Sequence, residues 1–199
     1  MKSSRIVVYM CIVLALSVMV GVTSCTQTYS PQPYAYFRID LPEQNYVCID
    51  SLGPYTIEIN EICRVNSLVV DSMALADEWY NIEYPTLNAN IHLSYKSVTK
   101  ATFRTISEEC HDLAYKHTIR ANAISEDFYA DTTTAVYGIY YQMEGEAASQ
   151  AQFFMTDSTH HFLRGSLYFN NTPNADSIAP VSTYIQNDII HLIETLRWK

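Results

Sequence analysis

Glycine is scarce in this chain, and its scarcity excludes several kinds of site. There are five glycines among 199 residues. The sequence contains neither a Gly-x-Gly-x-x-Gly fingerprint nor a Walker loop, so we expect no backbone cradle for nucleotide phosphates. No serine lies in a Gly-x-Ser-x-Gly elbow, which removes the usual signature of a serine hydrolase.

Positive charge is also in short supply. Lys and Arg number 12 against 21 Asp and Glu, which gives a formal net charge of −9. Such a balance repels phosphate backbones and anionic head groups, so nucleic acid is not an expected partner. Two of the basic residues, Lys2 and Arg5, lie at the start of the chain, so the remainder is more acidic still.

Cysteine is too sparse for a disulfide framework. Of the five cysteines, Cys11 and Cys25 belong to the N-terminal segment, and Cys48, Cys63 and Cys110 remain. Three cysteines permit one bridge at most, and no pair has the spacing of zinc ligands, so we predict no metal site. Cys48 and Cys63 lie on neighbouring extended segments and could pair. The favoured interpretation is that all three are small buried side chains.

The N-terminal segment is typical of an export signal that ends in a lipid-attachment site. After the basic start, an uncharged and mostly apolar run spans 6–22 and ends at Val22-Thr23-Ser24-Cys25. A Cys directly after small residues is typical of a bacterial lipobox. A membrane-spanning anchor is the alternative, but the run is slightly short for the roughly 20 residues that a spanning helix needs. We predict a signal peptide at 1–24, lipidation of Cys25, a tether at 25–34 and a single domain at 35–199.

Beyond the tether, the hydrophobic pattern predicts a strand-rich domain. Apolar and polar residues alternate in the segments 35–41, 55–59 and 91–95, as in strands with one buried face. The segments 79–84 and 91–95 predict a hairpin. Further strands are predicted at about 121–129, 134–144, 148–156 and 161–169.

Two helices are predicted where the apolar residues recur at helical spacing and no longer alternate with polar ones. The first has Ser97 or Thr99 as its N-cap and an apolar stripe of Phe103, Ile106, Cys110, Leu113 and His117. The second has Asp176 or Ser177 as its N-cap and a buried stripe of Val181, Ile185, Ile189, Leu192 and Leu196. Hairpins separated by one helix and closed by another predict an α+β fold with a largely antiparallel sheet.

The histidine and carboxylate patterns give little support for catalysis. Glu108 and His111 have the spacing of half a carboxylate-bridged metal site, but no second Glu-x-x-His exists, so a solvated helix face is favoured. His117 on the apolar stripe is more typical of a hydrogen-bonded core residue than of a base. His160 and His161 lie beside a predicted turn, where a fortuitous metal contact is the only function suggested. We predict no catalytic residue, no metal and no cofactor.

Tyrosine is abundant, with sixteen residues. Tyr36, Tyr140 and Tyr168 fall opposite the predicted core residues of their strands. They would line a second hydrophobic layer beneath a helix, which is the favoured interpretation, or a binding surface. Arg38 and Arg164, on the same faces, would bond within the sheet or pair with the carboxylates of a partner. Arg38, Arg164 and Tyr168 are therefore the predicted partner-binding residues.

Six short segments are distinctive: Tyr-Phe-Arg-Ile-Asp-Leu-Pro at 36–42, Ile-His-Leu-Ser-Tyr-Lys at 91–96, Leu-Ala-Tyr-Lys-His-Thr at 113–118, Phe-Leu-Arg-Gly-Ser-Leu-Tyr-Phe at 162–169, Pro-Asn-Ala-Asp-Ser-Ile-Ala-Pro at 173–180 and Glu-Thr-Leu-Arg-Trp-Lys at 194–199. With these segments, nearly the whole mature chain, from Tyr29 to the last residue, resembles the gliding-motility lipoprotein GldD family of Bacteroidetes. The later part, a strand that leads through Pro-Asn into a capped helix, is also similar to the PsbP-like α/β/α sandwich.

The resemblance implies a noncatalytic lipoprotein needed for gliding and for the associated type IX secretion machinery. Its implied partners are the membrane, through the lipid anchor, and envelope proteins of that machinery. Thr26 is not the Asp that retains lipoproteins in the inner membrane, and no acidic residue occurs before Asp40. Both features favour an outer-membrane anchor facing the periplasm. The alternative is a periplasmic domain, with or without enzymatic activity, that binds a small molecule or peptidoglycan.

Overall fold

The structure is a computed structural model that describes residues 6, 9–10, 38–67, 77–171 and 174–199. The chain divides into two compact units, residues 1–37 and 38–199, and the fold given below is that of the second unit. Cys25 and the predicted tether lie outside the described residues. In the parts that the structure describes, no helix combines the length and the apolar character that crossing a membrane requires.

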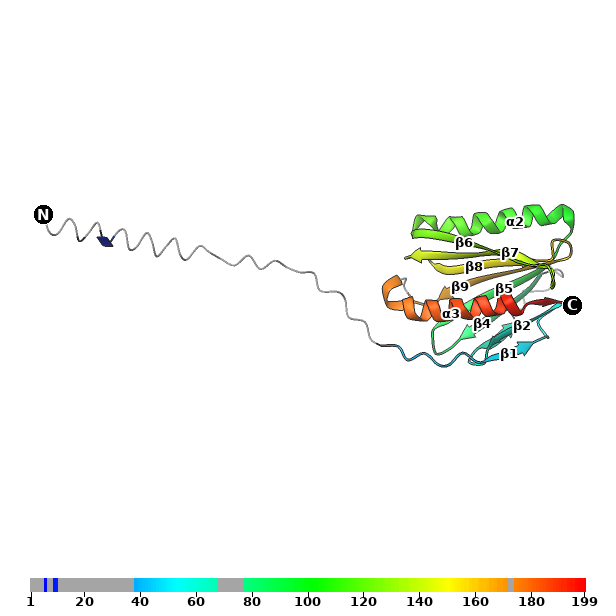
Figure 1. The fold of residues 1–199 in the computed structure, drawn as a ribbon, viewed down its shortest axis with the longest axis horizontal. Helices are drawn as coiled ribbons and strands as arrows, with labels where there is room; N and C mark the ends of the chain where they lie inside the picture. Colours follow the sequence, from blue (N-terminus) through cyan, green and yellow to red (C-terminus); the bar gives the residue numbers. More distant parts are fainter. Residues whose placement is uncertain (1–5, 7–8, 11–37, 68–76, 172–173) are drawn as a thin grey trace. The chain divides into compact units, whose positions relative to one another are not determined.

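A seven-stranded antiparallel sheet forms the centre of the domain (Figure 1). Its order is β3-β4-β5-β9-β8-β7-β6. The strands are β3 (Arg64–Ser67), β4 (Asp77–Tyr84), β5 (Ala89–Ser97), β6 (Ala121–Asp131), β7 (Val136–Gly145), β8 (Ser149–Thr156) and β9 (His161–Phe169). The predicted hairpin is confirmed as β4–β5, and β6 to β9 match the four later predicted strands. Close packing between strands is clear at Gly165, where a Cβ atom would lie 2.2 Å from Cε1 of Phe153.

A smaller sheet of three strands is built from both ends of the domain. It has the order β1-β2-β10, with β1 (Tyr46–Ile49), β2 (Tyr55–Asn60) and β10 (Arg197–Trp198). The C-terminal residue is held there as well, since the backbone N–H of Lys199 donates to the carbonyl of Pro54 at 2.9 Å. The apolar residues Tyr55, Ile57 and Ile59 of β2 join the main core.

Two helices contribute to two separate apolar layers, one on each face of the large sheet. Phe153 packs in the core that contains Ile185 and Ile189 of α3 (Ala175–Thr195), whereas its neighbour Phe154 packs with Cys110 of α2 (Lys100–Tyr115). Because successive residues of a strand point to opposite faces, α2 and α3 cover opposite faces of the sheet. The prediction of an α+β fold, with helices on both sides of a largely antiparallel sheet, is confirmed.

Several local predictions need correction. No strand forms at residues 38–41, so the predicted strand at 35–41 is wrong in its described part. The N-cap of α3 is Asn174, whose side-chain oxygen accepts from the backbone N–H of Ser177, and not Asp176 or Ser177. Thr99, one of the two predicted caps, does begin α2. The α2 helix ends at Tyr115 and continues as a 3-10 helix, η1 (Lys116–Ile119), so the predicted stripe loses its α-helical spacing before His117.

The structure also decides between the alternative interpretations of the three cysteines. Cys48, Cys63 and Cys110 are free thiols, and only Cys110 is fully buried. Cys48 is exposed on β1, opposite Glu58, so the interpretation of three buried side chains is wrong for this residue. Burial raises the pKa of the Cys110 thiol to about 11 and that of the half-buried Cys63 thiol to about 12. Neither thiol is therefore activated as a nucleophile.

Candidate functional site

The strand register gathers polar side chains on one part of the large sheet. Ser166 of β9 lies opposite His92 of β5 on one side and Gln152 of β8 on the other. Residues that pair directly across strands share a face, so these rows form one surface. We call it the polar face and define it by Asn81, His92, Ser94, Gln152, Arg164, Ser166 and Tyr168.

The polar face adjoins α2 but extends beyond it. Phe162 precedes Arg164 on the same face of β9 and belongs to the apolar layer of α2, where its ring stacks on Phe154. That layer includes residues of β6 to β9 and, within the described ranges, no residue of β4 or β5. His92 and Ser94 are accordingly half-buried rather than covered. The α2 helix therefore forms one border of the polar face.

Arg164 and two unpartnered groups lie at the middle of the polar face. The Arg164 guanidinium donates to Oε1 of Gln152 at 3.1 Å. The amide nitrogen of Gln152 and the hydroxyl of Ser166 are buried, and neither has a hydrogen-bond partner among the described residues. Buried polar groups without partners are uncommon in folded proteins and cost free energy. Because both atoms are shielded from solvent, half-buried Arg164 is the member of this cluster that another molecule could contact.

Tyr168 and His92 form the neighbouring aromatic part of the surface. Their rings meet edge to face, with centroids 5.3 Å apart. Nδ1 of His92 is hydrogen-bonded to Oδ1 of Asn81, which fixes the imidazole on the sheet. Burial lowers the pKa of His92, so the ring is neutral near pH 7. Tyr168 itself is half-buried and presents an aromatic surface of the kind that is enriched at interfaces.

The three predicted partner-binding residues do not lie together. Arg164 and Tyr168 share the polar face, as the alternation of β9 predicted. Arg38 precedes the first strand, and its guanidinium is paired with Asp40 at 3.0 Å, with both side chains almost fully exposed. An exposed pair of this kind contributes little to stability. Of the three predicted tyrosines, Tyr140 is buried beneath α3, which confirms the layer interpretation there, and Tyr36 lies outside the described residues.

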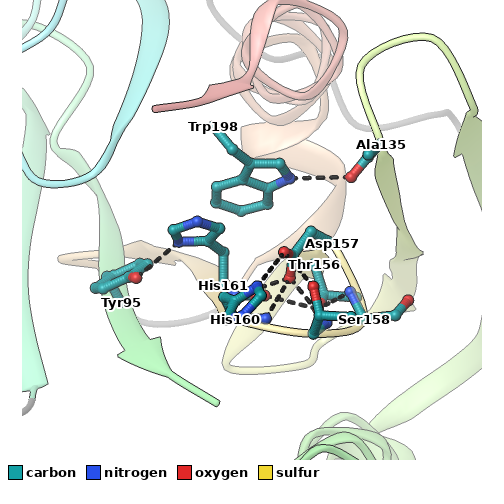
Figure 2. Close-up of polar contacts among 9 residues, drawn as sticks. Tyr95, Ala135, Thr156, Asp157, Ser158, His160, His161 and Trp198 are labelled. Carbon is teal, nitrogen blue, oxygen red and sulfur yellow. Dashed lines mark hydrogen bonds and ion pairs between the residues drawn. The ribbon is translucent and has the colours of Figure 1, made fainter. Parts of the chain in front are cut away.

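His160 and His161, considered from the sequence as metal contacts, interact with other side chains of the domain. Nδ1 of His161 shares a hydrogen bond of 2.8 Å with the hydroxyl of Tyr95. The imidazole also stacks on Trp198, with 5.1 Å between the ring centroids (Figure 2). His160 lies 3.4 Å from Asp157, the residue that holds the β8–β9 turn. Burial raises the pKa of Asp157, but hydrogen bonds from His161, Thr159 and His160 outweigh it and lower the pKa well below its usual range.

Glu108 and His111 of α2 also interact with other side chains of the domain. Glu108 accepts from Arg104 at 2.8 Å on the exposed side of α2. His111 lies 3.3 Å from the Tyr141 hydroxyl, and the side chain of His117 lies outside the described residues. Within the described ranges, no three His, Cys, Asp or Glu side chains are grouped as metal ligands would be.

A buried carboxyl group in the core was not predicted from the sequence. Asp188 of α3 is 3% exposed and accepts hydrogen bonds from Gln44, Tyr46, Asn60 and Tyr84 at 2.8 to 3.3 Å. These donors come from β1, β2, β4 and the segment before β1. The carboxyl group of Asp188 therefore connects strands of both sheets to α3, and we interpret its role as structural. A single Asp inside an apolar stripe was the only available signal.

The fold and surface define a class: an α+β sandwich domain with helices on both faces of an antiparallel sheet and a polar, partly uncovered sheet face. The family model for the gliding motility lipoprotein GldD matches residues 26–198. The chain belongs to this family, as the resemblance of its segments indicated. No curated protein matches the chain at a significant level. Family membership associates the chain with a membrane as a lipoprotein and gives it an accessory role in gliding motility.

Proposed function

We propose that the protein is a lipid-anchored, noncatalytic component of the gliding and type IX secretion machinery. In this proposal, residues 1–24 are removed, Cys25 carries the acyl chains, and residues 35–199 form one domain that faces the periplasm from the outer membrane. The observation that carries the proposal is the family match over residues 26–198. The contacts of the histidines support the noncatalytic part of the proposal, because His111, His160 and His161 each contact another side chain of the domain.

The polar face is our proposed contact for a partner protein of this machinery. Arg164 supplies a half-buried cation, and Tyr168 supplies an aromatic surface beside His92. Arginine and tyrosine are among the residues that most often dominate binding energy at interfaces. A carboxylate or backbone carbonyl of the partner would accept from Arg164. Arg38 would act as a separate contact near the anchor.

Type IX cargo secretion tests this proposal. Deletion of the protein should reduce cargo secretion, and also gliding where the organism glides. At matched protein levels, Arg164→Ala or Tyr168→Ala should reduce secretion several-fold. Arg104→Ala is the matched control, because Arg104 is an exposed arginine on α2 and is paired only locally with Glu108. Normal secretion in the deletion strain would contradict the proposal.

Histidine variants test the noncatalytic part separately. His111→Ala and His117→Ala should leave secretion largely unchanged, because we assign no chemistry to either imidazole. Folding of each variant is checked by its thermal unfolding midpoint. A stably folded His117→Ala variant that secretes no cargo would contradict a noncatalytic role.

A second candidate function follows from half-buried Arg164 and Tyr168, a cation and an aromatic ring on one face of β9. In this alternative, the polar face binds a small polar molecule or a fragment of peptidoglycan. Soluble muropeptides are the probe, and their binding is measured by calorimetry with the wild-type protein and with Arg164→Ala and Tyr168→Ala. Binding that is lost in both variants would favour this alternative over a protein partner.

A further inference from the structure

The strand β6 forms one edge of the large sheet. It is the last strand in the sheet order and pairs, within the described ranges, with β7 alone. It has 11 residues, and its register is regular from Ala123 to Asp131. An edge strand presents a row of unpaired backbone N–H and C=O groups, which proteins usually protect with charged side chains (lysine above all), proline, bulges or a short length. β6 contains neither proline nor a basic residue; its charges are acidic, and its bulge lies at its start, between Ala121 and Ala123.

A pocket accompanies β6 on the α3 face of the sheet. Its volume is about 220 Å³, and its lining includes Tyr129, Tyr140, Ile190 and Ile193. Two carboxyl groups, those of Asp127 and Glu194, stand beside these apolar side chains. Ile190 is 42% exposed, which is unusual for a large apolar residue of a packed helix. The pocket therefore combines an apolar floor with negative charge.

A second pocket lies on the opposite, α2 face. Its volume is about 330 Å³, and it is lined by Phe103, Ile139, Tyr141 and Phe154 together with the acidic residues Glu108 and Asp112 of α2. Ile139 lies directly opposite Phe128 of β6 in the strand register. The Phe128 side chain is 76% exposed. This face therefore carries an exposed apolar side chain at the sheet edge, whereas the charge of Glu108 is already paired with Arg104 at 2.8 Å.

The two faces of β6 offer different contacts to an added strand. Asp127 of β6 pairs with Tyr140 of the first pocket, and the next residue, Phe128, pairs with Ile139 of the second. A strand laid along β6 would direct successive side chains to the two faces in the same alternation. In recognition by strand addition, backbone hydrogen bonds provide affinity, and pockets for alternate side chains provide specificity.

We propose that β6 is a docking edge for an extended segment of another protein, with interspersed apolar and basic side chains. The apolar side chains would contact Phe128 and the first pocket, and the basic ones would meet Asp127 and Glu194. A second copy of this chain is a poorer occupant, because paired β6 strands would bring acidic residues together and supply no basic ones. The surface is distinct from the polar face, so its test is independent of the proposed function.

Designed peptides supply the first test, with the full-length lipoprotein in detergent. The probe is an end-blocked nine-residue peptide of alternating Val and Lys. Its controls are the Val–Glu counterpart and a Val–Lys peptide with N-methylated backbone nitrogens, which cannot pair with a strand. We expect the probe to bind and to slow hydrogen exchange of outward-facing β6 amides at least tenfold at saturation. Both controls should bind at least tenfold more weakly.

Two edge variants separate docking on β6 from general attraction of a basic peptide to an acidic protein. Phe128→Lys should weaken probe binding at least tenfold and abolish the protection of β6. Val47→Lys is the matched control, because Val47 is an exposed apolar residue of β1 in the smaller sheet, and it should bind as the wild type does. Equal binding of the N-methylated peptide, or protection of amides other than those of β6, would overturn the proposal. Failure of the probe to protect the β6 amides would overturn it equally.

Discussion

At the scale of single residues, the domain contains two kinds of buried polar group with opposite meanings. Asp188 has a protein donor for each of its contacts, from Tyr46, Asn60, Tyr84 and Gln44. Gln152 and Ser166 each retain a buried atom without a partner among the described residues. A fully satisfied group stabilises one arrangement of the core, whereas an unsatisfied buried group costs free energy. The first kind supports the fold, and the second lies beside Arg164 in the interior of the polar face.

Replacement of Asp188 tests its structural role. Asp188→Ala leaves the hydroxyls of Tyr46 and Tyr84 and the amide of Asn60 without their acceptor in the core. We expect the free energy of unfolding to fall by about 3 kcal/mol or more, since each abandoned buried donor costs roughly 1–3 kcal/mol. Urea unfolding measures the change. Asp112→Ala, an exposed acidic control on α2, should stay within about 0.5 kcal/mol, and an equal effect of both variants would contradict the role of Asp188.

At the scale of elements, the two helices differ in how well their buried faces could be predicted. The predicted stripe of α3 is buried throughout, from Val181 at 6% exposure to Leu196 at 0%. In α2, the stripe through Phe103, Ile106 and Cys110 continues to Ala114, which is fully buried, and not to Leu113. A helical spacing allows either continuation. The prediction from sequence assigned Leu113, the larger apolar residue, to the buried stripe, but the smaller Ala114 packs in the layer between α2 and the sheet.

Leucine truncations measure this difference between the helices. Leu192→Ala should lower the free energy of unfolding by about 2–5 kcal/mol, because the side chain is 2% exposed in the main core. Leu113→Ala should cost less than about 1 kcal/mol, because Leu113 is 36% exposed. Chemical denaturation of both variants in the same buffer gives the comparison. A Leu113→Ala cost equal to that of Leu192→Ala would mean that α2 packs with its other face toward the sheet.

At the scale of the whole molecule, the proposed lipid anchor determines where the domain acts. The domain is acidic, so electrostatic attraction to anionic lipids would not hold it at a membrane, and acyl chains are required. Cys25→Ser should abolish incorporation of labelled palmitate and move the protein from the membrane fraction to the soluble periplasm. Ser24→Ala, which keeps a small residue before the cysteine, should leave both properties unchanged. Labelled fatty acid in the Cys25→Ser variant would refute the assignment.

The sequence by itself determined the family, the order of most strands and helices, and the buried face of α3, because those features are encoded locally by motifs and by hydrophobic periods of two and 3.6. It also placed Arg164 and Tyr168 on one side of β9, since alternation requires only neighbouring residues. It could not show that His92, Gln152 and Ser166 meet them, because strand order and register join residues that are far apart in the chain. The same holds for Asp188 and for the pocket beside β6. Those sites exist only where separate elements pack together, and the tertiary structure alone decided them.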